Sequence, residues 1–163
     1  MSLPATVAAP SDILFIGGTG VISAAAAEHA VALGHRLTIL NRGKSADRPA
    51  PEGAQVVTAD IRDAAAVREA LRGREFDAVA DFISFTPDHA AAAIEQFTGR
   101  TGQYVFVSSA SAYQKPPARL PILESTPLRN PFWQYSRDKI ACEDLLMRAY
   151  RDDGFPEIGR AHV

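Results

Sequence analysis

The chain has 163 residues, 47% of them hydrophobic and 22% charged, and its formal net charge is −2. This length fits one domain, and the composition excludes a disordered chain and a polyelectrolyte tail. The near-neutral charge gives no reason to expect a nucleic-acid partner, and the single cysteine, Cys142, excludes an internal disulfide. Because no signal peptide and no apolar run of membrane-spanning length is visible, we expect a cytoplasmic protein without a membrane partner.

Short apolar runs alternate with helical segments along the chain. Strands are predicted at residues 13–16, 36–40, 55–58, 76–83 and 103–107. Helices are predicted at residues 21–33, 63–71, 87–97 and from about 132 to 151, with loops at 41–53 and 115–131. Continuous apolar strands separated by helices are typical of a parallel sheet covered on both faces. The predicted fold class is therefore α/β, a Rossmann-like doubly wound parallel sheet that binds ligands beyond the carboxyl ends of its strands.

A glycine-rich turn, Gly17-x-x-Gly20, joins the first strand to the first helix. Glycines let the backbone approach a pyrophosphate, and the helix that follows offers free N–H groups and a partial positive charge. Ser23 stands where the usual fingerprint has a third glycine, and a serine can still allow close packing of helix and strand. In this βαβ context the turn predicts dinucleotide binding; a glycine turn without ligand is the alternative.

The second strand is followed by Asn41-Arg42-Gly43-Lys44, where an NAD enzyme usually carries a carboxylate for the ribose hydroxyls. Arg42 and Lys44 would instead attract a 2′-phosphate, so we favour NADP over NAD. A solvated basic loop is the alternative. After the third strand, Asp60 and Ile61 are candidates to hold the adenine, although Asp60 is equally consistent with a plain turn residue.

Tyr135 and Lys139 are four residues apart on the last helix and therefore share one face. A phenol is a poor base at neutral pH, and a nearby ammonium favours its phenolate form. The tyrosine can then move a proton to or from a substrate oxygen while the nicotinamide exchanges a hydride. A serine hydroxyl after the fifth strand would hold the same oxygen.

Together these segments resemble the short-chain dehydrogenase/reductase superfamily, in its extended NAD-dependent epimerase/dehydratase branch. The resemblance covers the chain to about Pro156 and matches the family's N-terminal part only. It is carried by FIGGTGVI (15–22), DI (60–61), YVFVSSASAY (104–113) and Tyr135-x-x-x-Lys139.

The resemblance implies a role for each matching residue. The family's catalytic serine or threonine lies four residues before a tyrosine, which matches Ser109 with Tyr113 as the landmark; Ser108 and Ser111 match less well. Tyr135 would be the acid/base and Lys139 would bind the nicotinamide ribose. The implied cofactor contacts are the pyrophosphate at Gly17, Gly20, Val21 and Ile22, the adenine at Asp60 and Ile61, and the length of the cofactor at Phe82 and Ile83.

The function that the resemblance implies is an NAD(P)-dependent oxidoreductase, epimerase or dehydratase acting on an alcohol or carbonyl carbon. A nucleotide sugar is the substrate class that the family suggests, and the full-length form is a candidate homodimer. The alternative is a non-catalytic dinucleotide sensor, or an RNA-associated relative of the same fold. We expect no metal site, because the four histidines lack ligand spacing, and we interpret Cys142 as a packing residue. Trp133 is equally consistent with packing and with lining the substrate pocket.

The last seven residues, EIGRAHV (157–163), depart from the family pattern, which has an apolar sixth strand there. They contain no β-rich run, and one codon choice for them, GAG ATC GGA AGA GCA CAC GTC, matches the start of a common short-read sequencing adapter. We therefore expect a truncated dinucleotide-binding domain over residues 1–156, inactive alone, and a non-native tail over 157–163. This tail should pack poorly and leave the edge beside the fifth strand exposed. A natural terminal coil or a lone sixth strand is the alternative.

Overall fold

Six strands form one parallel sheet in this computed structural model, which describes residues 9–43 and 48–161. They are β1 (Asp12–Ile16), β2 (Arg36–Asn41), β3 (Gln55–Thr58), β4 (Ala78–Asp81), β5 (Tyr104–Val107) and β6 (Glu157–Ala161). The order across the sheet is β3-β2-β1-β4-β5-β6, and each neighbouring pair is parallel. The order reverses between β1 and β4, which is the point where doubly wound sheets bind ligands. The predicted Rossmann-like fold is confirmed.

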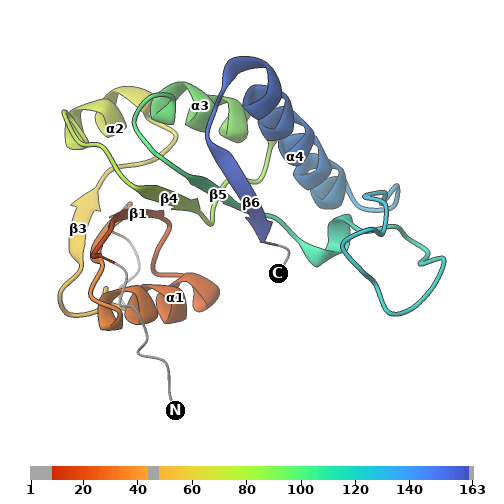
Figure 1. Cartoon of the computed structure of the whole chain (residues 1–163), viewed down its shortest axis with the longest axis horizontal. Helices are drawn as coiled ribbons and strands as arrows, with labels where there is room; N and C mark the ends of the chain where they lie inside the picture. The colour runs from red at the N-terminus through yellow and green to blue at the C-terminus, as the bar shows by residue number, and fades with distance from the viewer. Residues whose placement is uncertain (1–8, 44–47, 162–163) are drawn as a thin grey trace, which may run out of the picture.

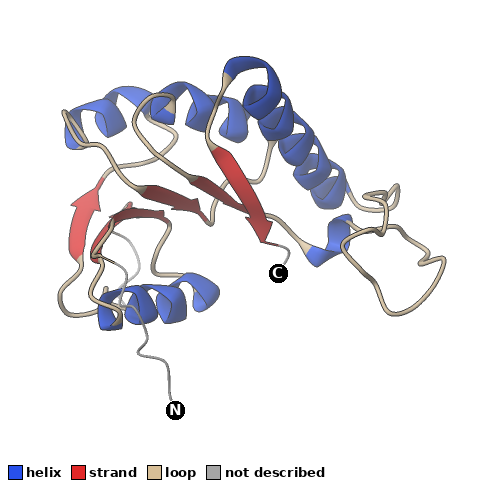
Figure 2. Cartoon of the chain, viewed as in Figure 1, coloured by secondary structure: helices blue, strands red, loops and turns tan. Residues whose placement is uncertain are grey.

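Four α-helices cover the two faces of this sheet unequally (Figures 1 and 2). They are α1 (Val21–Ala32), α2 (Ala64–Ala70), α3 (Pro87–Phe97) and α4 (Gln134–Asp153). Figure 1 shows α1 on one face of the sheet and α2, α3 and α4 together on the other. The carboxyl ends of the strands thus lie between α1 and α4, where the sequence predicts the site.

The core has two parts, one on each face of the sheet. The smaller part packs α1 against the sheet through the small side chains of Ala27 and Ala30, which contact the cluster of Phe15, Leu37 and Ile39. The larger part lies under α2, α3 and α4 and includes the fully buried rings of Phe97, Tyr104 and Phe106. Alanine has high helix propensity and little volume, so α1 can pack close to the sheet. This brings the first turn of α1 near the strand ends.

Several element boundaries differ from the sequence prediction by one or two residues, and two of them lie beside the predicted site. β4 ends at Asp81 rather than continuing to residue 83, because the Asp81 carboxylate accepts hydrogen bonds from the N–H groups of Ile83 and Ser84. These bonds turn the chain away from the sheet. The last helix begins at Gln134, with Trp133 as its N-cap. Both shifts affect residues beside the predicted site.

The sheet also contains a sixth strand, which the sequence analysis kept only as the alternative to a poorly packed tail. The prediction of a bare edge beside the fifth strand is wrong for this structure, because β6 pairs with β5 in parallel. Strand pairing uses main-chain groups, so a segment of low β-propensity can pair where an open edge lies beside it. The pairing carries a register shift between Tyr104 and Phe106.

Among the residues that the structure describes, no helix is long and apolar enough to cross a membrane. Lys44, a predicted cofactor contact, lies outside the described residues.

Candidate functional site

The glycine turn after β1 is crowded against neighbouring elements. Gly17 has φ +84°, and a Cβ added there would lie 2.4 Å from Cγ2 of Ile83. A Cβ on Gly18 would lie 2.9 Å from Cγ2 of Ile39. A side chain at either glycine would therefore have to displace a neighbour. Gly17 also has a left-handed backbone, which favours glycine. The backbone of this turn can therefore come close to a ligand at the carboxyl edge of the sheet.

Ser23 closes this turn with its hydroxyl group. The Gly20 N–H donates to Ser23 Oγ at 2.8 Å, and Ser23 Oγ donates to the Gly17 carbonyl at 2.7 Å. The serine thus replaces the third glycine and also ties the two other fingerprint positions together. The N–H groups of Val21 and Ile22 stand in the first turn of α1, where no intrahelical carbonyl can accept from them.

Two adjoining cavities extend from this turn along the carboxyl edge of the sheet. The first, of about 300 Å³, is lined on one side by the glycine turn and the start of α1 and on the other by Phe82, Phe85, Ser108, Tyr135 and Lys139. The second, of about 280 Å³, is lined by Thr19, Leu40, Asn41, Arg42, Arg48, Ala59 and Ile61. Gly17, Gly20 and Ile83 line both. The predicted pyrophosphate contacts therefore stand between the predicted nicotinamide and adenosine ends.

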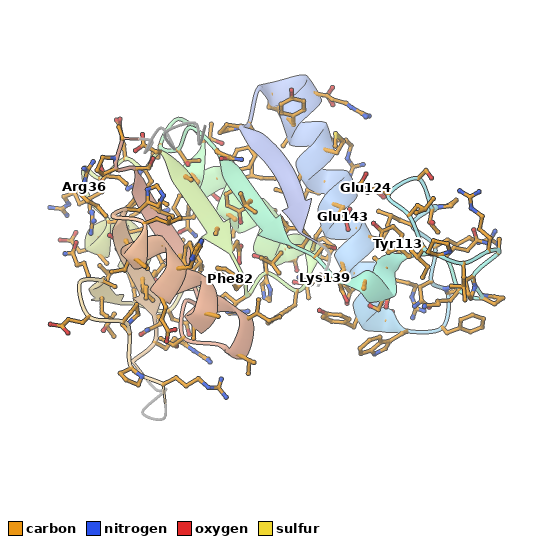
Figure 3. The ribbon with its side chains drawn as sticks, turned by 60° about the horizontal axis from the view of Figure 1, so that its bottom comes forward. Arg36, Phe82, Tyr113, Glu124, Lys139 and Glu143 are labelled. Carbon is orange, nitrogen blue, oxygen red and sulfur yellow. The ribbon has the colours of Figure 1, made fainter. Side chains whose placement is uncertain are left out.

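Lys139 enters the first cavity from α4 and is 1% exposed. Its Nζ donates to the carbonyl oxygens of Ser84 and Val107, both at 2.7 Å. These carbonyls follow β4 and end β5, so the ammonium is fixed beyond the carboxyl ends of two central strands. Figure 3 shows Lys139 and Phe82 just beyond those ends, with Glu143 further along the helix.

Tyr135 stands one turn before Lys139, half-buried in a group of aromatic rings. Its ring centroid lies 4.8 Å from that of Trp133 and 6.4 Å from that of Phe85. Trp133 and Phe85 are 56% and 40% exposed, so the rings form the rim of the cavity. The structure therefore places Trp133 beside the candidate site.

The serines after β5 divide between two hydrogen-bond networks. Ser108 lines the first cavity and donates to Oε1 of the buried Glu143 at 2.5 Å. Ser109 is not among the residues that line it; its Oγ lies 2.9 Å from Ser111 Oγ, which accepts from Ser136 at 2.8 Å. The structure thus places Ser108 in the cavity, although the family motif matches it less well than Ser109. The catalytic role of Ser109 stays a prediction.

The predicted adenosine end of the site lies at the loop after β2. Asn41 Oδ1 accepts from the Gly43 N–H at 2.8 Å, which shapes the turn that presents Arg42. Arg48 lines the same cavity, although the sequence analysis did not select it. The several cations in the 41–53 loop were the sequence signal that could have identified Arg48 as a cavity residue. Asp60 does not line either cavity; its Oδ1 accepts from the Arg62 N–H at 3.1 Å, so its contact with adenine also stays a prediction.

Cys142 is buried on α4, and burial raises the pKa of its thiol to about 12. A thiol with that pKa stays neutral near pH 7, so Cys142 is a packing residue rather than a nucleophile.

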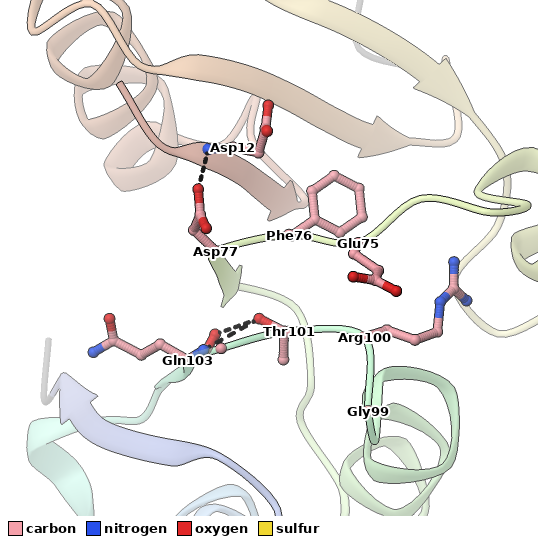
Figure 4. Close-up of a pocket in the computed structure, with 9 residues that line it drawn as sticks. Asp12, Glu75, Phe76, Asp77, Gly99, Arg100, Thr101 and Gln103 are labelled. Atoms are coloured by element: carbon pink, nitrogen blue, oxygen red, sulfur yellow. Dashed lines mark hydrogen bonds between the residues drawn. The ribbon is translucent and has the colours of Figure 1, made fainter. Parts of the chain in front are cut away.

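A larger hollow, of about 780 Å³, lies at the opposite, amino edge of the sheet (Figure 4). Asp77 Oδ2 accepts from the Asp12 N–H there at 2.7 Å, and Arg100 donates to the carbonyls of Leu71 and Arg74. Ligands of doubly wound sheets bind at the other edge. The size of this hollow therefore does not make it the functional site.

The residues at the carboxyl edge fit a dinucleotide. Gly17 and Gly18 of the turn have no room for a side chain, and the first turn of α1 presents N–H groups without a helical acceptor. The buried Lys139 ammonium lines the first cavity. This combination defines a dinucleotide-binding α/β domain. Residues 13–159 match the model of the NAD dependent epimerase/dehydratase family, and the chain belongs to that family.

Two curated relatives are UDP-glucose 4-epimerases. The protein of Streptomyces lividans is 29% identical over 151 residues, covering 82% of this chain and 46% of the relative. The protein of Lactobacillus helveticus is 29% identical over 159 residues, covering 87% and 48%. The chain spans about half the length of these relatives.

Solved structures show the same fold. UDP-glucose 4-epimerase from Brucella ovis in complex with NAD has a TM-score of 0.79 at 23% identity, covering 91% of this chain and 50% of that one. The Bordetella bronchiseptica enzyme WbmG in complex with NAD and UDP has a TM-score of 0.69 at 22% identity, covering 85% and 50%. The resemblance stated from the sequence is confirmed at the level of family and fold.

Proposed function

We propose that residues 1–156 form the dinucleotide-binding part of an NAD(P)-dependent enzyme that acts on an alcohol or carbonyl carbon. The observation that carries the proposal is that Tyr135 and Lys139, one helical turn apart, line one cavity with the glycine turn. The cofactor, when bound, supplies hydride transfer at its nicotinamide carbon. A sensor would need only the cradle, whereas this cavity also holds a phenol and an ammonium.

In the proposed reaction Tyr135 exchanges a proton with the substrate oxygen. The Lys139 Nζ lies 6.0 Å from the centroid of the Tyr135 ring, and both side chains line the first cavity. Lys139 also binds the nicotinamide ribose. A serine hydroxyl, from Ser109 as the family motif implies, orients the substrate oxygen.

A nucleotide sugar is the proposed substrate class. The support comes from the curated relatives, which are UDP-glucose 4-epimerases, and from a neighbour that holds both NAD and UDP. Catalysis is proposed to need more chain than residues 1–156, since those relatives are about twice as long.

The proposed cofactor preference is for NADP over NAD. Asn41 replaces the usual acid, and two guanidinium groups, Arg42 and Arg48, line the cavity at the adenosine end. A guanidinium can pair with a 2′-phosphate through two hydrogen bonds, whereas a carboxylate would repel it.

Tyr135→Phe tests the catalytic assignment, because it removes the hydroxyl group and keeps the ring. In a gene product that includes the C-terminal half, we expect turnover of UDP-glucose to fall about a hundredfold or more. Dinucleotide affinity, measured by calorimetry, should change less than about twofold. Retained turnover would favour the non-catalytic sensor, and lost affinity would mean that the phenol acts in binding rather than chemistry.

A further inference from the structure

Asp81, at the carboxyl end of β4, is a fully buried carboxylate that accepts hydrogen bonds from the loop after β4 and from β5. Its Oδ1 accepts from the N–H groups of Ile83 and Ser84 at 2.8 and 2.9 Å. Its Oδ2 accepts from the hydroxyl groups of Ser84 and Tyr104 at 2.5 and 2.6 Å. Four donors thus converge on one buried side chain, and both of its oxygens accept hydrogen bonds inside the core.

The bonds to Asp81 determine where two other groups point. The two N–H bonds turn the chain after β4, so that Phe82 and Ile83 line the cofactor cavity. The same turn aims the Ser84 carbonyl at Lys139 Nζ, 2.7 Å away. Asp81 therefore organises one of the two acceptors that fix the buried ammonium.

We propose that Asp81 is a positioning residue: it holds the loop 82–85 and the Lys139 ammonium in the geometry that binds the dinucleotide. Its contact with the site runs through Ser84, since Asp81 itself does not line either cavity. The inference rests on the proposed function for one step, that Lys139 contacts the bound cofactor.

Asp81 also contributes charge. Burial lowers the pKa of Lys139, and the negative charges of Asp81 and Glu143 oppose that shift. The titratable groups around the ammonium come from four elements: Tyr135, Cys142 and Glu143 on α4, Tyr104 on β5, His89 on α3, and Asp81 at the end of β4. Of these, Asp81 provides the largest electrostatic support for the protonated lysine. Without that charge, Lys139 should lose its proton at lower pH.

Asp81→Asn tests the proposal, because an amide keeps the size and one acceptor oxygen but removes the charge. NADH and NADPH are titrated into this chain over a range of pH. We expect affinity at pH 7 to fall about tenfold, and the pH above which binding weakens to move lower. Tyr104→Phe is the matched control, since it removes one hydrogen bond to Asp81 and keeps the carboxylate. It should lower the unfolding temperature but leave affinity within about twofold and the pH profile unmoved.

Two results would overturn the inference. Asp81→Asn with wild-type affinity and pH profile would remove the positioning role, and equal losses in Asp81→Asn and Tyr104→Phe would reduce Asp81 to a structural support. If Asp81→Asn does not fold, Asp81→Glu decides: it keeps the charge but displaces the loop, so affinity should fall while the pH profile stays. Unchanged affinity in that variant would contradict the proposal. A wild-type chain that binds neither dinucleotide would instead contradict the proposed function.

Discussion

At the amino edge of the sheet, the larger hollow is lined by polar groups that bond to one another. The Asp12 carboxylate pairs with Arg36 through two bonds of 2.6 Å, its N–H donates to Asp77, and Arg100 donates to two backbone carbonyls. At the carboxyl edge the cavities are smaller, at about 300 and 280 Å³. There the first turn of α1 keeps N–H groups that no helical carbonyl can accept from.

The comparison indicates that hydrogen-bond donors without a partner in the helix, rather than cavity volume, mark the proposed binding site. Each edge holds a cation bonded to two backbone carbonyls: Lys139 at the carboxyl edge and Arg100 at the amino edge. The two cations therefore form a matched pair, in which only one is expected to meet a ligand.

Replacing these cations should give the largest contrast. Lys139→Met should weaken NADH and NADPH binding roughly tenfold to a hundredfold, because a charge-assisted hydrogen bond contributes about 1.5–3 kcal/mol. Arg100→Met should lower the unfolding temperature and leave dinucleotide affinity unchanged. Calorimetric titration and thermal unfolding of both variants make the measurement. Equal losses of affinity would mean that Lys139 acts only through stability.

Gly17 and Gly34 have the same backbone conformation but different neighbours, so an alanine substitution at each can distinguish backbone strain from steric crowding. Gly17 and Gly34 have φ of +84° and +83°, but a Cβ at Gly34 meets nothing within 4 Å. Gly34→Ala should cost about 1 kcal/mol of unfolding free energy from the left-handed backbone alone. Gly17→Ala must also displace Ile83, so it should cost more and reduce dinucleotide affinity about tenfold. Chemical denaturation with a binding titration checks both; equal costs would show that the Gly17 contact yields easily.

Substitutions at the adenosine end are expected to change dinucleotide affinity less than those at Lys139 or Gly17, and to change mainly the preference for NADPH over NADH. The double variant Arg42→Ala/Arg48→Ala should weaken NADPH binding about tenfold and NADH binding less than twofold, since the 2′-phosphate is the group that the guanidinium groups would meet. The double variant Arg68→Ala/Arg151→Ala, which removes two exposed cations on α2 and α4, is the control for net charge. If the wild-type chain binds NADH tenfold more tightly than NADPH, the proposed preference is wrong.

Removing residues 157–163 should have the smallest effect on binding. The described lining residues of the two cavities at the carboxyl edge all lie between Gly17 and Lys139. The deletion should leave dinucleotide affinity within about twofold and lower the unfolding temperature, because the edge of β5 becomes exposed. A large loss of affinity would contradict the proposal that these residues are a non-native tail, as would a genomic sequence that encodes them with different codons before a native stop.

The sequence was sufficient for the first five strands of the sheet and for the glycine turn, because both depend on local patterns. Apolar runs and Gly17 carry their own signal, and the alternation of elements predicts the parallel order. The Asp81 network could not be predicted, since it joins Ser84, Tyr104 and Lys139 across three elements only after folding. Likewise the family motif selects Ser109, whereas Ser108 lines the cavity in the structure. Ser109 instead caps the 3₁₀ turn at Ala110–Ala112, and the sequence did not show which of the two serines would face the cavity.

Titration of NADH and NADPH into the unmodified chain, followed through Trp133, tests the central claim most directly. Trp133 is the single tryptophan, and its ring lies 4.8 Å from that of Tyr135 at the rim of the cavity. Its emission overlaps the absorption of reduced nicotinamide, so a bound dinucleotide should quench it by energy transfer. We predict saturable quenching that the oxidised dinucleotide reverses and that Lys139→Met shifts to roughly tenfold to hundredfold higher dinucleotide concentrations. A folded chain whose Trp133 emission shows no saturable change up to millimolar dinucleotide would contradict the account.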